Sequence, residues 1–268
     1  MLSGVHRPDR GTIEVAGESL PFIASPGAAV DAGIATVFQE ILVAPQQSVL
    51  ANIWLGRDGL VRRSVVGAQR RERAAGALGQ LIDNPRLGAA AGRLPLSDRQ
   101  ATCIARALLC EPRVLILDEA TSTLDVATRD RLFAVLRGLC AEGVGVLFIS
   151  HRMDEVEEIA DRVTVMRSGD TVATRARGEA SARELVQLMT GIEDVGAELQ
   201  PAQPPSERVR RDEIVLRASK VRLHADARPI DAEFRAGELV GVAGLEGHGQ
   251  DQFLRVLAGA PPTGGAVL

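Results

Sequence analysis

Two carboxylates stand at the end of an apolar run in the middle of the chain. Residues 114–117 are all apolar, and Asp118 and Glu119 follow them directly. Such a run is typical of a strand buried in a parallel sheet, and ligands of these sheets lie at the carboxyl ends of the strands. An acid pair there suits phosphoryl transfer: Asp118 would hold magnesium through water, and Glu119 would polarise the attacking water.

Polar residues also follow two other apolar runs. Ser150 and His151 come directly after residues 144–149, and Gln39 comes after the β-prone residues 34–38. Taken alone, His151 is more often a buried residue at a strand end, and Gln39 a surface amide. If the runs are parallel strands, however, their carboxyl ends meet at one edge of the sheet and bring these residues together.

The elements that would position these residues alternate along the chain. The runs 113–118, 144–149 and 162–166 read as strands, and residues 127–141 and 151–160 show helical spacing, with Asp125 as a possible cap. This order predicts an α/β domain with a mainly parallel sheet. We expect the domain to cover residues 1–195, with further segments as follows: β-prone residues 11–16, a helical subdomain at about 46–110, and a terminal amphipathic helix at 181–190.

The last part of the chain has a different composition. Residues 196–212 contain Pro201, Pro204, Pro205 and an arginine-rich stretch, which is typical of a linker. A second β-rich pattern begins at residue 213 and runs to residue 268. We therefore expect a linker at 196–212 and a partial second domain at 213–268.

Charge and composition exclude several classes of protein. The net charge of −4 disfavours a nucleic-acid binder that works through a basic surface. No apolar run approaches the ~20 residues of a membrane helix, and the first residues do not resemble a signal peptide. Three widely spaced cysteines indicate reduced thiols rather than disulfides or a zinc site. Of the 31 basic residues, Lys220 is the one lysine.

A glycine-rich segment lies in the second pattern. Gly244, Gly247 and Gly249 follow an apolar stretch at 238–243, which we expect to be a strand, and precede a helix. Strand, glycine-rich loop and helix are the context of a phosphate-binding P-loop, in which backbone N–H groups surround phosphate oxygens. Gln250 and Asp251, however, stand where that loop needs lysine and a hydroxyl residue. A turn without a ligand and a weak nucleotide site both remain open interpretations.

Several motifs in order give the chain a family resemblance. With the acids at 118–119, residues 1–195 are similar to the ATP-binding subunits of ABC transporters, and most similar to tandem-domain importers of ribose, galactose and xylose. The further motifs are residues 37–40, 94–100, 104–108, 122–125 and 150–153. The resemblance implies a P-loop NTPase-like ABC ATPase domain that lacks its P-loop segment here, and then part of a second, degenerate domain at 213–268.

The resemblance also implies roles, with ATP and Mg²⁺ as cofactors. Glu119 would be the catalytic carboxylate, His151 would contact the γ-phosphate, and Gln39 would touch the magnesium or the attacking water. Asp118 would support the magnesium, and Asp125 would signal across a pair of domains. Nucleotide would also be bound by the glycine-rich loop and by the family's signature segment, which here is Ser97, Asp98, Arg99 and Gln100.

The signature segment departs from the family pattern Leu-Ser-x-Gly-Gln. Without gaps, Pro95 takes the serine position and Ser97 that of the second glycine; a shift of two residues instead matches Ser97 with the serine. Either alignment leaves the loop without glycine, and Asp98 would repel a phosphate. The segment is therefore expected to be weakened.

The resemblance predicts the energising subunit of a carbohydrate importer, which couples ATP hydrolysis to sugar uptake. Because no lysine precedes residue 220, we expect a chain truncated at both ends and inactive alone. The expected partners are transmembrane permease subunits, indirectly a periplasmic sugar-binding protein, and possibly a second copy, at the cytoplasmic face of the membrane. Two alternatives are a pseudo-ATPase binding subunit and a non-transport relative that acts on ribosomes or DNA.

Overall fold

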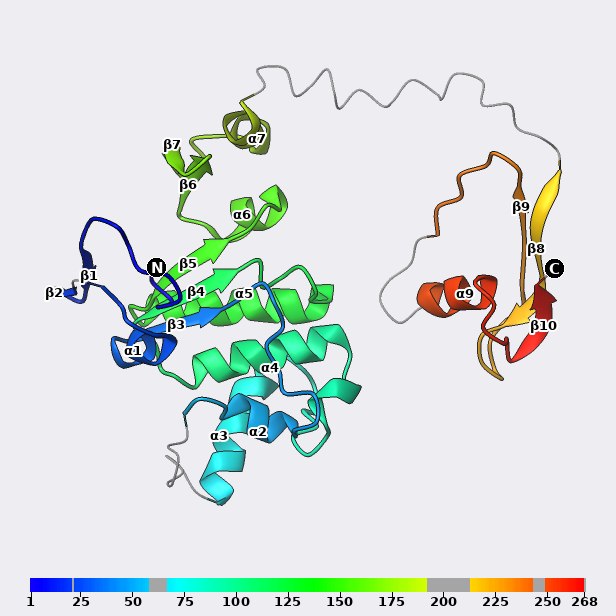
Figure 1. Cartoon of the computed structure of the whole chain (residues 1–268), viewed down its shortest axis with the longest axis horizontal. Coiled ribbons are helices and arrows are strands. Elements are labelled where there is room, and N and C mark those ends of the chain that lie inside the picture. Colours follow the sequence, from blue (N-terminus) through cyan, green and yellow to red (C-terminus); the bar gives the residue numbers. More distant parts are fainter. Residues whose placement is uncertain (21, 58–66, 192–212, 243–248, 268) are drawn as a thin grey trace. The chain divides into compact units, whose positions relative to one another are not determined.

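The computed structural model describes residues 1–20, 22–57, 67–191, 213–242 and 249–267. The chain divides into two compact units, Met1–Ile192 and Glu193–Leu268, which are described separately (Figure 1). The predicted linker at 196–212 lies outside the described residues. None of the described helices is long and apolar enough to cross a membrane.

A parallel sheet forms the centre of the first unit, as predicted. Its strands lie in the order β3 (Ile34–Val37), β4 (Val114–Asp118) and β5 (Gly145–Ile149), so that β4 is paired on both sides (Figure 1). Because all three strands run in the same direction, the segments that follow them meet at one edge of the sheet. The register places Asp118 opposite Ile149 at this edge.

The central strand is apolar throughout because both of its faces are covered. Leu115 and Leu117 belong to the larger core, which includes residues of α4 (Leu96–Leu108) and α5 (Val126–Ala141). Ile116 points to the other face and packs with Ile34 and Val15 in a second cluster. This alternation explains why the sequence shows a continuous apolar run.

Strand β5 differs from β4 because it lies at the end of the sheet. Val146 and Phe148 pack against the larger core, and Phe148 meets Phe133 edge to face. On the other face, Leu147 and Ile149 keep 44% and 43% of their surface exposed. The sheet is therefore covered less completely at β5 than at β4.

The expected helical subdomain is confirmed in its described parts. It contains α2 (Val49–Ile53), α3 (Ala68–Gly79), the 3-10 turn η1 (Ala91–Arg93) and α4. Trp54 anchors it: the side chain is fully buried, and its Nε1 donates to the carbonyl of Arg70 at 3.2 Å. One aromatic ring thus joins α2 to α3.

The predicted helices after β4 are confirmed, with small shifts in their ends. Helix α5 begins after its cap Asp125, and α6 spans Met153–Ile159 rather than 151–160. The amphipathic helix is α7 (Ala182–Thr190), where Ser181 and Glu184 form a reciprocal capping box.

The strand predicted at residues 162–166 is confirmed, but it lies outside the parallel sheet. These residues form β6 (Arg162–Arg167), which pairs antiparallel with β7 (Asp170–Ala176) in a separate hairpin. Ser168 and Gly169 both have positive φ angles of 53° and 90°, a backbone that favours tight hairpins. The β-prone run at residues 11–16 contains β1 (Ile13–Val15), which pairs antiparallel with β2 (Glu18–Leu20). The elements that the sequence reading missed are β2, the short helix α1 (Pro26–Asp31) and β7.

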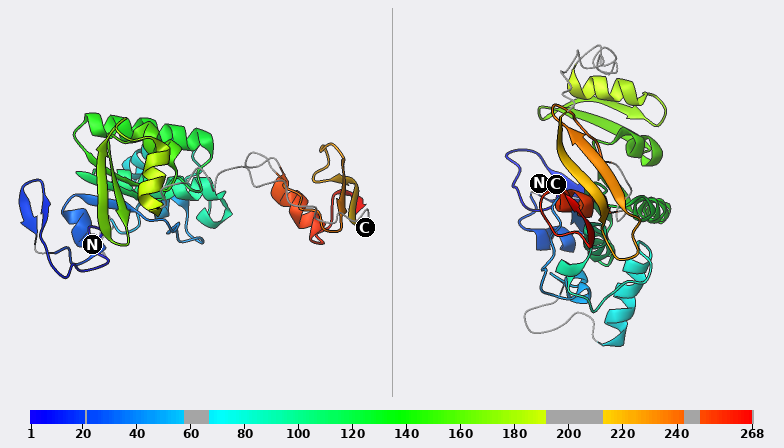
Figure 2. Two further views of the ribbon diagram at one scale, coloured as in Figure 1. Left: turned by 90° about the horizontal axis from the view of Figure 1, so that it is seen from above. Right: turned by 90° about the vertical axis from the view of Figure 1, so that its right-hand side faces the viewer.

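In its described residues, the second unit is an antiparallel sheet with one helix. The strands lie in the order β10 (Gly264–Val267), β8 (Ile214–Arg222) and β9 (Ile230–Arg235). Helix α9 (Gln250–Leu257) lies beside the strands, as Figure 2 shows, and packs Phe253 and Val256 against Ala218 and Val221. The β-rich pattern expected from residue 213 is confirmed.

The strand expected at 238–243 is not found in its described part, residues 238–242. Leu239 is 84% exposed, and Val240 and Val242 are also exposed, so these apolar side chains are not buried against the described strands. Gly244 and Gly247 lie outside the described residues. Gly249 caps α9 with a φ of 97°, and a Cβ there would lie 2.9 Å from Leu223 Cδ1.

Candidate active site

Three side chains meet where the three parallel strands end. Gln39 follows β3, Glu119 follows β4 and His151 follows β5. Gln39 Nε2 donates to Glu119 Oε2 at 2.9 Å, and His151 Nδ1 lies 3.1 Å from Glu119 Oε1. The structure therefore brings together the three residues for which the sequence predicts catalysis.

The central carboxylate is held but remains accessible. Each Glu119 oxygen has one partner, and the side chain keeps 27% of its surface exposed. His151 is 63% exposed. A carboxylate so placed can accept a hydrogen bond from a water molecule while its neighbours fix its orientation.

The backbone at Glu119 is unusual for a residue with a side chain. Its φ is +47°, in the left-handed region, and its N–H donates to the carbonyl of Ile149 at 3.0 Å. Such a conformation persists only where surrounding contacts enforce it, and it is frequent at functional sites. The bond to Ile149 ties the loop after β4 to the end of β5.

The predicted magnesium ligands, Asp118 and Gln39, lie at the same edge of the sheet. Their carboxylate and amide oxygens suit Mg²⁺, which uses one or two protein oxygens beside water and phosphate. Within the described residues, no three His, Cys, Asp or Glu side chains gather as a metal-binding group. The magnesium site at Asp118 stays a prediction.

The signature segment forms the first turn of α4. Pro95 occupies the N-cap position of α4. Ser97 and Gln100 are each 1% exposed, and Arg99 donates to the carbonyls of Leu94 and Gly92. Nucleotide contact by Ser97, Asp98, Arg99 and Gln100 stays a prediction.

Ser97 is engaged by a second predicted site residue. Its hydroxyl donates to Asp125 Oδ2 at 2.7 Å, while Asp125 Oδ1 accepts from the N–H of Thr128 at 2.8 Å and so caps α5. Burial acts to raise the pKa of Asp125, but hydrogen bonds from Thr128 and Ser97 outweigh it and lower the pKa below its ordinary value. The Asp125 carboxylate therefore joins α4 to α5.

The pKa of Asp98 shifts in the opposite direction to that of Asp125. Burial, and next the charge of Asp125, raise the pKa of Asp98 above its ordinary value, while Arg86 opposes this. Like charges that approach each other disfavour ionisation. The weakened nucleotide contact of this segment stays a prediction.

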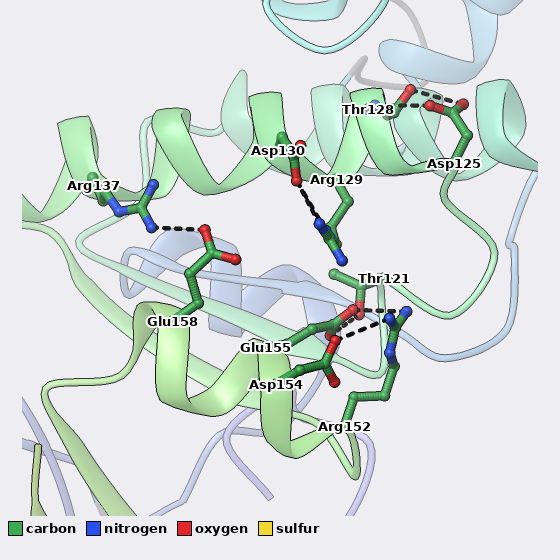
Figure 3. A network of polar contacts seen from close by, with 10 residues as sticks. All are labelled: Thr121, Asp125, Thr128, Arg129, Asp130, Arg137, Arg152, Asp154, Glu155 and Glu158. Carbon is green, nitrogen blue, oxygen red and sulfur yellow. Dashed lines mark hydrogen bonds and ion pairs between the residues drawn. The ribbon is translucent and has the colours of Figure 1, made fainter. Parts of the chain in front are cut away.

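The sequence reading missed a buried acid behind the site. Glu155, in the first turn of α6, is 1% exposed and accepts from Thr121 Oγ1 at 2.6 Å (Figure 3). It also accepts from Ser150 Oγ at 3.2 Å. An acid in the first turn of a helix is usually exposed and read as a favourable charge for the helix dipole. No sequence signal distinguishes Glu155 from its acidic neighbours on α6.

The parallel sheet, the helical subdomain and the acid at the sheet edge together define the class of protein as a P-loop NTPase-like ATP-binding cassette. Solved structures agree. An ATP-binding cassette solved as a dimer bound to ADP and Pi matches 65% of this chain and 76% of its own with a TM-score of 0.58. An ABC transporter cassette in its ADP conformation matches 74% and 80%, also with a TM-score of 0.58. Their identities of 21% and 22% make this a likeness of fold.

Sequence comparisons give the family. Residues 1–122 match the family described as "ABC transporter". The chain is 41% identical, over 97% of its length, to the ribose import ATP-binding protein RbsA 1 of Mesorhizobium japonicum, and 39% identical over 98% to RbsA 3 of Rubrobacter xylanophilus. It spans 50% and 52% of those relatives, which is about half their length. Over residues 1–122, and over about half the length of these relatives, the chain is similar to the ATP-binding proteins of ABC transporters.

Proposed function

We propose that this chain supplies the hydrolytic part of an ATP-binding subunit that energises a carbohydrate importer. The observation that carries the proposal is the Glu119 carboxylate, held between Gln39 at 2.9 Å and His151 at 3.1 Å at the carboxyl edge of a parallel sheet. The names of the relatives, which are ribose import ATP-binding proteins, support the substrate class.

In this proposal Glu119 is the catalytic carboxylate. It accepts a hydrogen bond from the attacking water and orients that water toward the γ-phosphate. His151 donates toward the phosphate oxygens, and Gln39 fixes the second oxygen of Glu119. Bound ATP would supply the phosphoryl group, and Asp118 would help to hold a Mg²⁺ ion, which would supply neutralisation of the phosphate charge.

The partners belong to the same proposal. Transmembrane permease subunits would bind the chain at the cytoplasmic face of the membrane, with contact through the helical subdomain and Gln39. A periplasmic sugar-binding protein would be reached through the permease, and a second copy could complete the nucleotide sites, as ABC cassettes are also solved as dimers. The net charge of −4 argues against a nucleic-acid partner.

A pseudo-ATPase is the second candidate, and one observation favours it. The lysine that would reach the phosphates of a P-loop is absent from residues 1–219, and Lys220 lies in β8. The intact Gln39–Glu119–His151 cluster argues against this candidate, because a subunit that only binds does not need a positioned catalytic acid.

A chimaera separates the two candidates. The half of RbsA 1 from Mesorhizobium japonicum that matches this chain is replaced by residues 1–268, and the hybrid is expressed in a strain that lacks its own ribose ATPase. We expect ribose uptake to be restored and to be lost again in the E119Q variant. A hybrid that assembles with the permease and binds ATP, but neither hydrolyses it nor supports uptake, would favour the pseudo-ATPase.

A further inference from the structure

A buried carboxylate links two of the loops that form the candidate active site. The side chain of Glu155 is fully buried, although an ionised carboxylate is costly to remove from water unless it is hydrogen-bonded or paired. Among the described residues it is the most deeply buried acid. A buried carboxylate needs hydrogen-bond donors or a cation, and the residues that supply them show which segments Glu155 connects.

The partners come from two different strand ends. Thr121, which is 2% exposed, donates from Oγ1 to Glu155 Oε2 at 2.6 Å, and Ser150 donates to the same oxygen at 3.2 Å. Arg152 Nη1 pairs with Glu155 Oε1 at 2.9 Å. Figure 3 shows Thr121, Arg152 and Glu155 converging beneath α5. One carboxylate therefore joins the loop after β4, the loop after β5 and the start of α6.

Each hydroxyl partner is a close neighbour of an active-site residue. Thr121 lies two positions after Glu119, and Ser150 directly precedes His151. The Ser150 hydroxyl also accepts from the N–H of Arg152 at 3.1 Å. This bond joins the two residues that flank His151 in the sequence. Within the described part of the chain, Glu155 bonds to Thr121, Ser150 and Arg152 and not to Glu119 or His151, and so acts through the two loops.

We propose that Glu155 is a positioning residue that holds the loop of Glu119 against the loop of His151. Stability alone gives little reason for a carboxylate here, because well-packed apolar residues commonly replace buried ion pairs without loss. The location of Glu155 gives a reason for its carboxylate, because the left-handed backbone at Glu119 needs contacts that enforce it. That this link serves catalysis rests on the proposed function. That Glu155 holds the two loops together does not depend on it.

The test uses the full 268-residue chain without nucleotide. The readout is the set of ring ¹⁵N and ¹³C signals of His151, assigned by their loss in H151N. E119Q gives the reference position of these signals when the carboxylate partner is removed. The test variants are E155L and E155Q, together with T121V and S150A, which each remove one partner of Glu155. E158Q is the matched control, because Glu158 lies in the same helix but pairs with Arg137 at the surface.

We expect E155L to move the His151 signals most of the way to the E119Q position, and E155Q, T121V and S150A to move them part of the way. E158Q should leave them in place. If E155L does not fold, the three milder variants still decide the result. Wild-type His151 signals in folded E155L, or in all three milder variants, would overturn the proposal even if the melting temperature fell. Failure of the chimaera to hydrolyse ATP would instead overturn the proposed function and leave this link intact.

Discussion

Two segments of this chain show apolar residues followed by a polar loop and a helix, yet they form different structures. Residues 114–119 give β4 and Glu119, the proposed catalytic acid, with β3 and β5 on either side and apolar clusters on both faces. Residues 238–242 form no strand, and Leu239 is 84% exposed. The comparison teaches that an apolar run becomes a strand only when neighbouring elements pair with its backbone and bury its side chains.

The largest expected effect is a change in the free energy of unfolding. L117A should lower the free energy of unfolding of the first unit by about 2–5 kcal/mol, because Leu117 is fully buried and the change leaves a cavity. L239A should change stability by less than about 0.5 kcal/mol, as is usual for exposed positions. Urea unfolding followed by the fluorescence of Trp54, the one tryptophan, reports the first unit, and far-UV circular dichroism reports the whole chain. Equal losses of unfolding free energy in L117A and L239A would contradict the conclusion that only the first segment is packed in a core.

The next effect concerns activity. In the chimaera, H151A should lower the rate of ATP hydrolysis by about 10²–10³-fold, the usual cost of removing a donor that stabilises developing charge. His224, which is exposed in the second unit, provides the control, and H224A should leave the rate unchanged. Steady-state phosphate release measures both. A comparable loss in H224A would show that the two units share the catalytic work.

A smaller effect tests the turn that follows the catalytic acid. D125A should cost about 1 kcal/mol at neutral pH, because the N-cap of α5 and the bond from Ser97 are lost. Since the pKa of Asp125 is lowered in the fold, its contribution is present above about pH 3.9, the unfolded value, and disappears as the pH falls through the folded value. Unfolding curves of both proteins should therefore converge in acid. A pH-independent difference would contradict this account.

The smallest effect has the opposite sign. The pKa of Asp98 is raised by burial and by Asp125, so its ionised form opposes folding once the pH exceeds the folded value. D98N should therefore stabilise the chain slightly at neutral pH, and the gain should vanish as the pH falls below about 3.9, where Asp98 is protonated in both states. Thermal melts at several pH values measure it. A stability loss at neutral pH would mean that Asp98 makes favourable contacts as an anion.

Much of the first unit could be predicted because its pattern is local. The apolar run of β4, the spacing of α5 and the cap at Asp125 each follow from neighbouring residues, and all three are confirmed. Parallel pairing then brings Gln39, Glu119 and His151 together. The partner of β6 could not be predicted in the same way, because choosing between a hairpin and the central sheet depends on the turn at Ser168 and Gly169.

Burial that depends on distant residues was harder to predict. Ser97 reads as an exposed signature residue, but its hydroxyl lies against Asp125. Glu155 reads as a surface acid, but loops from two other strands enclose it. In both cases the side chain is placed by partners far along the chain, at sequence separations of 28 residues for Ser97 and Asp125 and 34 for Thr121 and Glu155.

The most direct test of the account is the rate of ATP hydrolysis by the chimaera with and without the Glu119 carboxylate. E119Q keeps the shape of the side chain and removes its charge, and should lower the rate by about 10²–10⁴-fold, the usual contribution of a catalytic acid or base. ATP binding should persist, and E142Q, at an exposed glutamate after α5, should match the wild type. Hydrolysis at the wild-type rate in E119Q would contradict the central claim that this acid carries the reaction.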